Sequence, residues 1–414
     1  MNSKKRVLQA LDHKEPDRVP VGEWGIDHDT VEKVIGRDTY WRNKKKGILA
    51  LWSGKRDEVV ESYKKDLVEL TEKVDYDLVP VHLVPPQDLQ PRKIEQTDKN
   101  TWRDEQGQIW KYSEGNDAIL LIDSPVRSFE SCDELREYFE LELVNRFGFR
   151  IKSRTENGYN LELDDESRLD LVRYVVDKLG NRKFIFARGF EEGVGNIDPL
   201  YLSEFEVASV FFGGNMENFF LTIAMKPELV QEAFNLYTEV NFAIAKVMID
   251  EGVDAIMPGG DFSDSNGPMV SPESIRKIFL PGMKKLSDYC YQREVRVMSH
   301  NCGNNWKIMN LLIEAGYECW QSIACKTADM DLKRLKEKYG EKVAFWGGIN
   351  IETLVAGTPE ENRKDVLYAL RYAAPKGGFI LGTSNSVCFG SKYENYMIAL
   401  ETLHKYGNYP IRLL

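Results

Sequence analysis

The feature that most constrains the fold is an alternation of short apolar runs with stretches of helical spacing, which continues beyond Leu135 to the end of the chain. Such an alternation is typical of βα units, whose strands pair in parallel while their helices cover the sheet. The sequence therefore predicts an α/β fold with a parallel sheet. The expected strands cover residues 77–83, 183–187, 255–258, 295–299, 318–321, 343–346 and 378–381.

Most of these runs are followed by a polar or glycine-rich loop. In a (β/α)8 barrel the loops after the strands share one face, and catalytic residues lie on that face. The clean runs number fewer than eight, so an open doubly wound sheet remains an alternative, although no Gly-x-Gly-x-x-Gly motif follows the first run. The length of 414 residues fits one barrel with insertions as well as two average domains. The loops are residues 188–191, 259–261, 300–303, 347–350 and 383–385.

The N-terminal part has a different organisation. Residues 4–12 have helical spacing, and residues 15–21 form a proline-punctuated extended arm that leads into Gly22-Glu23-Trp24. Residues 30–74 are rich in charge pairs at helical spacing and predict helices. Residues 99–124 alternate polar and apolar side chains around a Gln-Gly pair, which predicts a β-hairpin inserted beside the barrel.

Composition excludes several classes of function. The net charge is −11, and no stripe of Lys and Arg interleaved with aromatic residues offsets it, so we expect no nucleic-acid partner. We also expect neither a signal peptide nor a membrane span, because no apolar segment has the required length. Six cysteines without a dense framework indicate reduced thiols in a cytoplasmic protein, in which a special cysteine is catalytic or a metal ligand.

His300 and Cys302 are the first candidates for a metal site. They are two residues apart at the end of an expected strand, so both side chains can point to the same side, as two ligands of one Zn²⁺ require. A packed and hydrogen-bonded His and Cys is the alternative reading of this spacing. A third ligand has to come from another loop, and Cys325 and Cys388 are the nearest thiols by strand order.

Carboxylates and aromatic residues near the strand ends are further candidates. Asp261 follows a strand and two glycines, so it can orient a substrate or relay a proton, or else cap the next helix. Glu23 and Trp24 place an acid beside an aromatic ring, which fits an aromatic or corrin-sized ligand, although surface packing is the simpler interpretation. Candidates near other strand ends are His82, Gln321 and Trp346.

Several motifs together resemble the uroporphyrinogen decarboxylase superfamily. The resemblance runs nearly end to end and keeps the order of the motifs. It implies a single (β/α)8 TIM barrel over residues 1–414, with an N-terminal extension over residues 1–75 and the hairpin of residues 99–124 as an insertion. The motifs are residues 6–13 (RVLQALDH), 15–21 (EPDRVPV), 266–273 (NGPMVSPE), 332–340 (LKRLKEKYG), 345–350 (FWGGIN) and 377–381 (GGFIL).

The superfamily contains porphyrin decarboxylases and zinc-dependent, corrinoid-linked methyltransferases, which differ in their sites. The decarboxylases carry an arginine-rich N-terminal loop, whereas this chain has GEWGIDHD at residues 22–29. The methyltransferases carry a His-x-Cys zinc pair, which His300 and Cys302 match. Residues 19–27 and 50–62 resemble most closely the methyltransferase components of aryl methyl ether O-demethylases.

One position departs from the family pattern. The last zinc cysteine of the family follows the final strand closely, where this chain has Asn385, and Cys388 comes three residues later. The resemblance therefore leaves the third and fourth ligands open between Cys388, Cys325, Asn385 and a carboxylate from another loop. We take Cys388 as the expected ligand beside His300 and Cys302.

The resemblance implies a methyltransferase that moves a methyl group from a methylated substrate, expected to be a methoxylated aromatic, to the Co(I) centre of a corrinoid protein. The expected cofactors are Zn²⁺ and a corrinoid (cobalamin) carried by the partner protein, because nothing in the chain resembles a cobalamin-binding domain. We expect Glu23 and Asp261 to be catalytic. The expected substrate-binding residues are Trp24, His82, Gln321, Trp346 and Asn385.

Three alternatives remain open. A methyl-corrinoid protein to thiol methyltransferase would use thiolate and His ligation. A decarboxylase of the same superfamily would act on a smaller acid without metal or corrinoid, and a non-enzymatic barrel would bind a tetrapyrrole or a corrinoid partner without turnover. The sequence also leaves open whether the protein is a homodimer.

Overall fold

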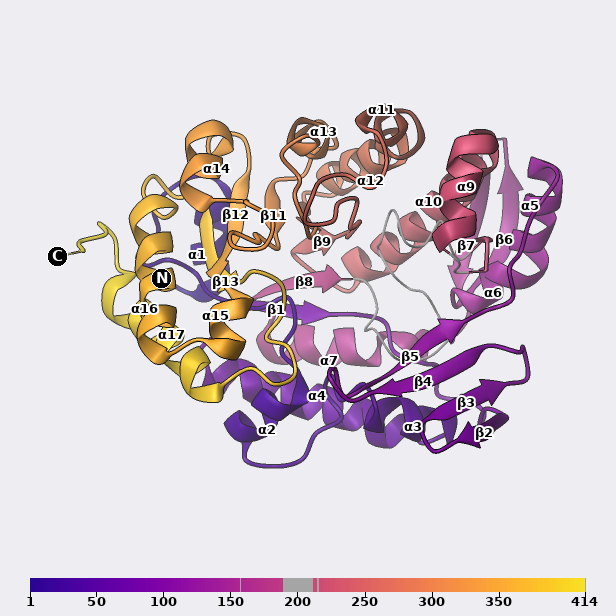
Figure 1. Ribbon diagram of the computed structural model, residues 1–414, viewed down its shortest axis with the longest axis horizontal. Coiled ribbons are helices and arrows are strands. Elements are labelled where there is room, and N and C mark those ends of the chain that lie inside the picture. Colours follow the sequence, from indigo (N-terminus) through magenta and orange to yellow (C-terminus); the bar gives the residue numbers. More distant parts are fainter. Residues whose placement is uncertain (157, 189–210, 214–215, 414) are drawn as a thin grey trace.

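The computed structural model describes residues 1–413 except 157, 189–210 and 214–215. Its centre is a curled parallel sheet of seven strands in the described residues (Figure 1). Each strand overlaps one of the seven expected runs, so the α/β barrel-like fold predicted from the sequence is confirmed. In spatial order the strands are β1 (Leu78–Val81), β8 (Phe184–Arg188), β9 (Ala255–Met257), β10 (Arg296–His300), β11 (Cys319–Gln321), β12 (Ala344–Ile349) and β13 (Phe379–Thr383).

The extended arm of residues 19–22 joins the two outer strands of this sheet. Val21 forms a parallel bridge with Leu381 of β13, and the Gly22 N–H donates to the Leu381 carbonyl oxygen over 3.2 Å. On its other side, the Val21 carbonyl oxygen accepts from the N–H of Asp77, the residue before β1, over 2.7 Å. The arm thus lies between β13 and β1 and completes the ring of hydrogen-bonded segments.

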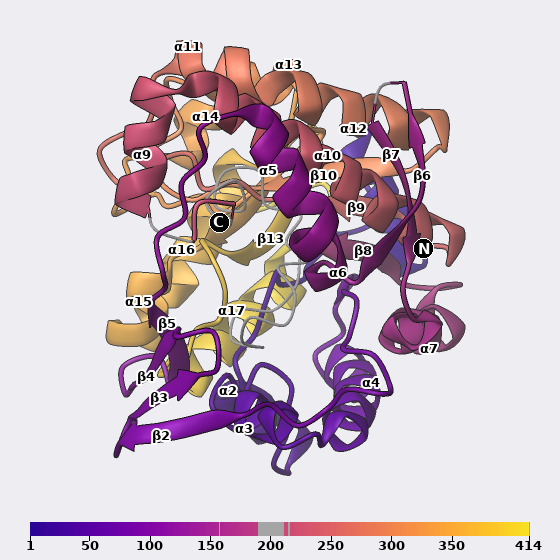
Figure 2. The ribbon, with the colours of Figure 1, turned by 90° about the vertical axis from the view of Figure 1, so that its right-hand side faces the viewer.

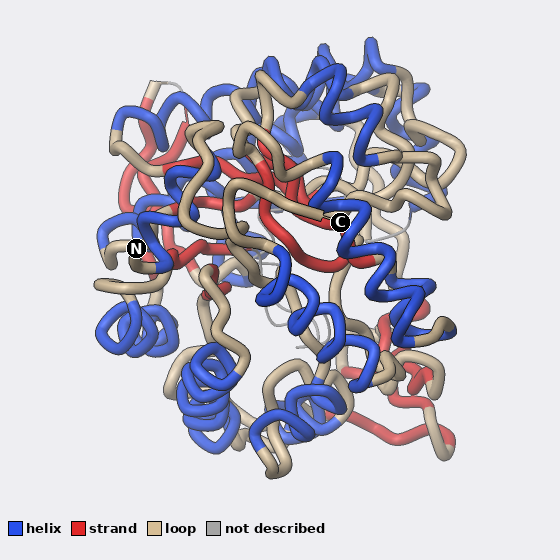
Figure 3. Tube along the Cα trace, turned by 90° about the vertical axis from the view of Figure 1, so that its left-hand side faces the viewer, coloured by secondary structure: helices blue, strands red, loops and turns tan. Residues whose placement is uncertain are grey.

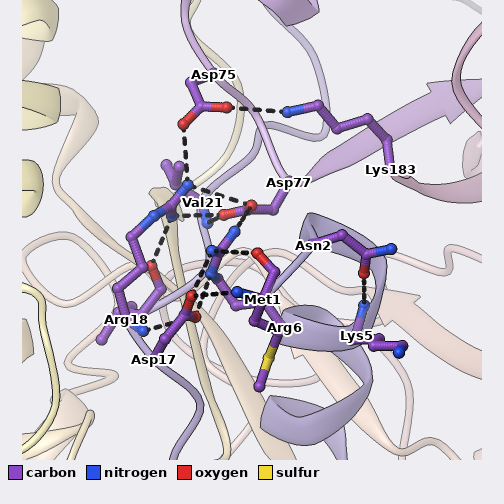
Figure 4. Close-up of polar contacts among 11 residues, drawn as sticks. Met1, Asn2, Lys5, Arg6, Asp17, Arg18, Val21, Asp75, Asp77 and Lys183 are labelled. Carbon is purple, nitrogen blue, oxygen red and sulfur yellow. Dashed lines mark hydrogen bonds and ion pairs between the residues drawn. The ribbon is translucent and has the colours of Figure 1, made fainter.

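A buried carboxylate fixes the arm in this place (Figure 4). The side chain of Asp77 is fully buried, and its two oxygens accept from Arg6 over 2.6 Å and from Arg18 over 2.7 Å. The Val21 N–H donates to the same carboxylate over 2.9 Å. A buried charge is tolerated only when it is paired and hydrogen-bonded, and here both conditions are met.

The interior of the barrel is one apolar cluster built from alternate strand residues. Phe186, Met298, Cys319 and Trp346 belong to it, together with Val7, Ala10 and Leu11 of helix α1 (Ser3–Leu11). Because side chains alternate across a strand, the next inward positions are Arg188, His300 and Gln321, two residues further along β8, β10 and β11. The apolar layer therefore supports polar residues at the C-terminal ends of the strands.

Helices cover the outside of the strands, as Figure 3 shows. Their apolar faces and the outward strand residues form the larger core cluster. The helices are α7 (Asp170–Leu179), α9 (Met216–Met225), α10 (Pro227–Asp250), α11 (Pro272–Ser274), α12 (Leu280–Gln292), α13 (Met309–Glu314), α14 (Leu332–Tyr339), α15 (Ile351–Ala356), α16 (Pro359–Tyr372) and α17 (Tyr393–Tyr406). Within the part of the chain that the structure describes, no helix is both long enough and apolar enough to cross a membrane.

The helices expected over residues 30–74 are present as α2 (His28–Ile35), α3 (Lys46–Trp52) and α4 (Arg56–Lys73). The prediction of a single hairpin over residues 99–124 is wrong in extent. The segment belongs to a four-stranded antiparallel sheet in which neighbouring strands follow one another along the chain. This sheet lies beside α2 and α3 in Figure 2. Its strands are β2 (Ile94–Asp98), β3 (Thr101–Asp104), β4 (Ile109–Ser113) and β5 (Ala118–Asp123).

A second antiparallel pair was not expected from the sequence. It consists of β6 (Phe149–Thr155) and β7 (Gly158–Leu163), and it packs on α10 (Figure 2). Short helices precede it: α5 (Cys132–Tyr138), a π-helical turn (Phe139–Leu143) and α6 (Val144–Arg146). Further single turns are the 3₁₀ turn Glu166–Leu169 before α7 and the π-helical turn Ile275–Phe279 before α12.

Candidate active site

Three side chains that bind metals in other proteins meet at the C-terminal ends of the strands. The ligand atoms of Asp261, His300 and Cys302 all lie within 4.8 Å of one another. The His300 Nε2 is 3.2 Å from the Cys302 Sγ and 3.9 Å from the Asp261 Oδ1, and the Cys302 N–H donates to that same oxygen over 2.6 Å. The expected pairing of His300 with Cys302 is therefore present, and Asp261 joins it from the loop after β9.

The backbone brings these two loops together. Gly259 forms a parallel bridge with His300, and the Gly260 N–H donates to the His300 carbonyl oxygen over 3.1 Å. Gly303 has a φ of 78°, and a Cβ at this position would lie 2.3 Å from the Ser263 carbonyl oxygen. Only glycine fits such a left-handed and crowded position, so the Asn301-Cys302-Gly303 turn can approach the Asp261 loop closely.

The hydrogen bonds of Gln321 fix the tautomer of His300. The Gln321 Nε2 donates to the backbone carbonyl oxygens of Asn385, over 2.8 Å, and of Thr383, over 3.3 Å. The Gln321 Oε1 therefore faces the His300 Nδ1 and accepts a short hydrogen bond from the N–H of that ring atom. The lone pair of the imidazole is left on Nε2, which faces Cys302 and Asp261. This is the arrangement that a metal-binding His requires.

The sulfur of Cys302 has polar neighbours from two strand ends. The Asn385 Nδ2 lies 2.9 Å from the sulfur, and the Ser322 Oγ lies 3.0 Å from it. Ser322 has a φ of 80°, which is rare outside glycine and typical of functional sites that surrounding structure holds in place. The Ser322 hydroxyl donates to the Ser384 carbonyl oxygen over 2.8 Å, so this strained residue is tied to the loop after β13.

The indole of Trp24 covers His300. The two ring centroids are 4.5 Å apart with an interplanar angle of 28°, which is a stacked arrangement. The guanidinium groups of Arg188 and Arg42 lie 4.7 Å and 5.4 Å from the indole centroid. Trp24 is half-buried. Its contact with His300 places it at the site, where the sequence analysis expected an aromatic side chain.

Glu23, expected to be catalytic, lies one residue away in an enclosed position. Its carboxylate accepts from the N–H and the hydroxyl of Thr383, over 2.9 Å and 2.6 Å, and from the Tyr396 hydroxyl over 3.1 Å. Burial raises the pKa of Glu23 to about 7 against these hydrogen bonds. These contacts anchor the arm to the end of β13.

His82 and Trp346 also lie in enclosed positions. The Nδ1 of His82 is 2.9 Å from the Leu83 carbonyl oxygen, and burial together with the charges of Arg188 and Arg42 lowers the pKa of His82 to about 3. Trp346 is fully buried, packs edge-on against Phe186 in the barrel core, and donates to the Gly22 carbonyl oxygen over 2.9 Å. Trp346 thus supports the arm from within the barrel, whereas His82 packs against Trp41 and Tyr63.

The two thiols considered as third ligands are not part of the group around His300. In the described residues that group contains Asp261 and neither Cys388 nor Cys325. The Cys388 Sγ lies 3.7 Å from the Ser391 Oγ, and the Cys325 side chain packs on the outer core, where burial raises its pKa to about 12. The loop after β13 turns so that Asn385, rather than Cys388, reaches Cys302.

Two features of the site were missed by the sequence analysis. Ser322 was not singled out, although a polar residue directly after Gln321 at a strand end was a usable signal. Asp261 was expected to act on protons, and the structure places it among the candidate ligands. The expected loop residues 189–191 after β8 lie outside the described residues.

The donor set fits a catalytic metal centre. An imidazole nitrogen, a thiolate and a carboxylate are the donor types that Zn²⁺ prefers, and three protein ligands leave a fourth position for water or substrate. The second ring nitrogen of His300 is held by an amide, as is usual for metal-binding His.

Comparison with known proteins agrees with the resemblance found in the sequence. The family model described as uroporphyrinogen decarboxylase (URO-D) matches residues 201–406. A solved structure of a methyltransferase from Methanosarcina mazei aligns with a TM-score of 0.61 and 16% identity, over 98% of this chain and 99% of that chain. The family model thus matches slightly less than half of the chain, and the aligned structure shows that the two proteins share a fold.

Other comparisons add nothing to this assignment. A chitinase, ChiB, from Flavobacterium johnsoniae aligns with a TM-score of 0.32 and 14% identity, over 68% of this chain and 95% of that chain. A TM-score at that level does not establish a common fold. No curated protein matches the sequence.

Proposed function

We propose that this chain is a zinc-dependent methyltransferase of the uroporphyrinogen decarboxylase superfamily, whose family model matches residues 201–406. It moves a methyl group from a methoxylated aromatic substrate to the Co(I) centre of a corrinoid protein. The observation that carries this proposal is the group Asp261, His300 and Cys302 at the C-terminal face of the barrel. A porphyrin decarboxylase has no need for such a set of ligands.

The Nε2 of His300, the Sγ of Cys302 and the carboxylate of Asp261 would hold the zinc. When bound, Zn²⁺ supplies Lewis acidity at the ether oxygen of the substrate. An aryl methyl ether reacts slowly because its leaving group is a poor one, so stabilising the negative charge that develops on oxygen lowers the barrier. The methyl–oxygen bond of the substrate would break, the Co(I) acceptor on the partner protein would supply the electron pair of the new bond to the methyl group, and the phenolate oxygen would keep the old pair and take a proton from water.

The protein side chains position the reactants. Trp24 stacks on the candidate ligand His300, and the guanidinium groups of Arg188 and Arg42 lie over the same indole, so Trp24 holds the imidazole in place beside the substrate position. Gln321 acts on the site through His300, and Trp346 acts through the arm and the barrel core. Glu23 likewise acts as a positioning residue, because its partners are Thr383 and Tyr396.

The donor set also argues against transfer of methyl to a thiol, the main alternative. A site that activates a thiol is expected to be rich in thiolate ligands, whereas this group has one sulfur, one nitrogen and one carboxylate. The oxygen ligand keeps the metal more electron-poor, which suits polarisation of an ether.

The decisive experiment is the metal content of the purified wild type and of matched variants. We expect about one zinc per chain in the wild type and its loss in His300→Ala, Cys302→Ser and Asp261→Ala, as a site with three protein ligands requires. Cys388→Ser is the control, because Cys388 lies outside the group. The zinc-loaded wild type is then assayed with methoxyarenes and a Co(I) corrinoid protein, with phenol formation as the readout. A wild type that binds no zinc, or zinc lost equally from Cys388→Ser, overturns the proposal.

A further inference from the structure

We propose that Asn385 is the residue that positions and tunes the sulfur of Cys302, and that Gln321 couples this action to His300. Asn385 would act as an N–H donor to the sulfur and not as a metal ligand. The inference rests on the proposed function, since it concerns the same metal site, and it adds a role to the residue that stands where a cysteine was expected.

The contacts form one continuous chain of amides. The Asn385 Nδ2 lies 2.9 Å from the Cys302 Sγ. The backbone carbonyl oxygen of Asn385 accepts from the Gln321 Nε2 over 2.8 Å, and the Gln321 Oε1 meets the His300 Nδ1. Gln321 is fully buried and His300 nearly so, whereas Asn385 and Cys302 are partly buried. A shift of the loop after β13 would therefore change the hydrogen bonds of both His300 and Cys302.

Asn385 differs in kind from the other polar neighbour of the sulfur. The Ser322 hydroxyl donates its hydrogen to the Ser384 carbonyl oxygen over 2.8 Å, so it presents lone pairs to Cys302. An amide nitrogen has only hydrogens to offer, so Asn385 meets the sulfur with an N–H. The two neighbours therefore act on the sulfur in opposite ways, and Asn385 is the one that stabilises negative charge.

A hydrogen bond to a thiolate draws electron density away from the sulfur and reduces its donation to a bound metal. A cysteine at position 385 would do the reverse, because it would add a second thiolate. Asn385 reduces the donation of the sulfur, and Asp261 supplies an oxygen ligand in place of a second thiolate. Both residues thus lower the electron density on the metal. A metal in that state polarises an ether oxygen better than it activates a thiol, so Asn385 helps to determine the substrate class.

The test replaces zinc by Co²⁺, whose sulfur-to-cobalt charge-transfer band reports the electron density on Cys302. Asn385→Leu is nearly isosteric but has no N–H, and Asn385→Ala is a second variant in case the first folds poorly. We expect both variants to move the band to longer wavelength, because the sulfur then donates more strongly, and to weaken Co²⁺ binding on the order of tenfold, because the sulfur is no longer held in position. Asn385→Cys should strengthen the band, and Cys388→Ser should leave it unchanged.

The outcomes separate the two proposals. A band and an affinity for Co²⁺ that are unchanged in Asn385→Leu and Asn385→Ala overturn the role of Asn385 while the metal site stands. A wild type that shows no sulfur-to-cobalt band overturns the metal site, and the inference falls with it. Far-ultraviolet circular dichroism of each variant verifies that a lost band does not reflect an unfolded chain.

Discussion

The indole of Trp24 rests on the imidazole of His300, with ring centroids 4.5 Å apart. Trp24 belongs to the N-terminal arm, whereas His300 ends the fourth strand of the sheet order. The arm is thus more than a closing segment of the barrel, because it places an aromatic ring directly on a candidate metal ligand. Changes that loosen the arm are expected to reach the metal site through this contact.

Replacing Trp24 by Ala should weaken zinc binding moderately. An aromatic stack contributes about 1 kcal/mol, so the zinc Kd is expected to rise roughly fivefold as His300 gains freedom. Trp24→Phe keeps a ring over the imidazole and should bind zinc almost as well as the wild type. Competition with a chromophoric chelator measures both. Equal weakening in the two variants would show that stacking is not the cause.

Replacing Gln321 by Leu should have a larger effect on the metal. The variant cannot accept from the His300 Nδ1, so the imidazole loses the partner that fixes its tautomer. Loss of such a partner typically lowers metal affinity on the order of 10- to 100-fold. A zinc titration of Gln321→Leu beside wild type measures the change, and an unaltered Kd would exclude the proposed role of Gln321.

Glu23 should make the stability of the fold depend on pH. Because burial raises its pKa from 4.5 to about 7, the folded protein holds this proton where the unfolded chain releases it. The stabilisation is fully present below pH 4.5 and is lost as the pH rises to about 7, with a total change of about 3 kcal/mol.

The matched variant for this prediction is Glu23→Gln, which has no titrating group at the position. Urea unfolding of both proteins across this pH range gives the difference in their unfolding free energies. We expect the wild type to lose stability relative to Glu23→Gln as the pH rises. A difference that stays constant with pH would mean that Glu23 titrates in the ordinary range.

Asp77→Ala should destabilise the fold strongly, because it leaves the guanidinium groups of Arg6 and Arg18 without their buried carboxylate (Figure 4). Breaking a buried ion pair costs about 3–5 kcal/mol. Asp75→Asn neutralises an exposed carboxylate that pairs with Arg18 and Lys183 and keeps a residue type that tolerates the φ of 52° at this position, so its cost is expected to be about 1 kcal/mol. Urea unfolding of the two variants tests the contrast, which comparable losses would refute.

The sequence predicts the sheet well because its signal is local. Each strand is a short apolar run between helices, and a run such as residues 379–383 is apolar on both faces because helices cover the outside. The pairing of His300 and Cys302 is equally local, since it depends only on the two-residue period of an extended chain.

The end of a strand is harder to locate. Gly347 and Gly348 were assigned to a loop, whereas they belong to β12. A Cβ at Gly348 would lie 2.7 Å from the Cβ of Ala369, so glycine serves here for close packing of helix α16 on the strand. Because the strand continues to Ile349, Trp346 lies deeper in the barrel than expected and its ring fills the core.

The extent of the antiparallel sheet was underestimated for a related reason. Strand β2 (Ile94–Asp98) is almost entirely exposed and polar, so it lacks the apolar alternation by which β3 and β4 were recognised. The third ligand depended on how the loop after β13 turns in space. That path is set by contacts with distant residues such as Ser322, which no spacing rule describes.

The position of the arm between β13 and β1 has a consequence for how the protein is made. Residues 19–22 are translated more than three hundred residues before their partner Leu381. During synthesis the arm can pair early with Asp77 beside β1, but its other side lacks a partner until β13 has been made. Contacts this distant along the chain also slow folding. The ring, and with it the contact of Trp24 with His300, can form only when nearly the whole chain has emerged.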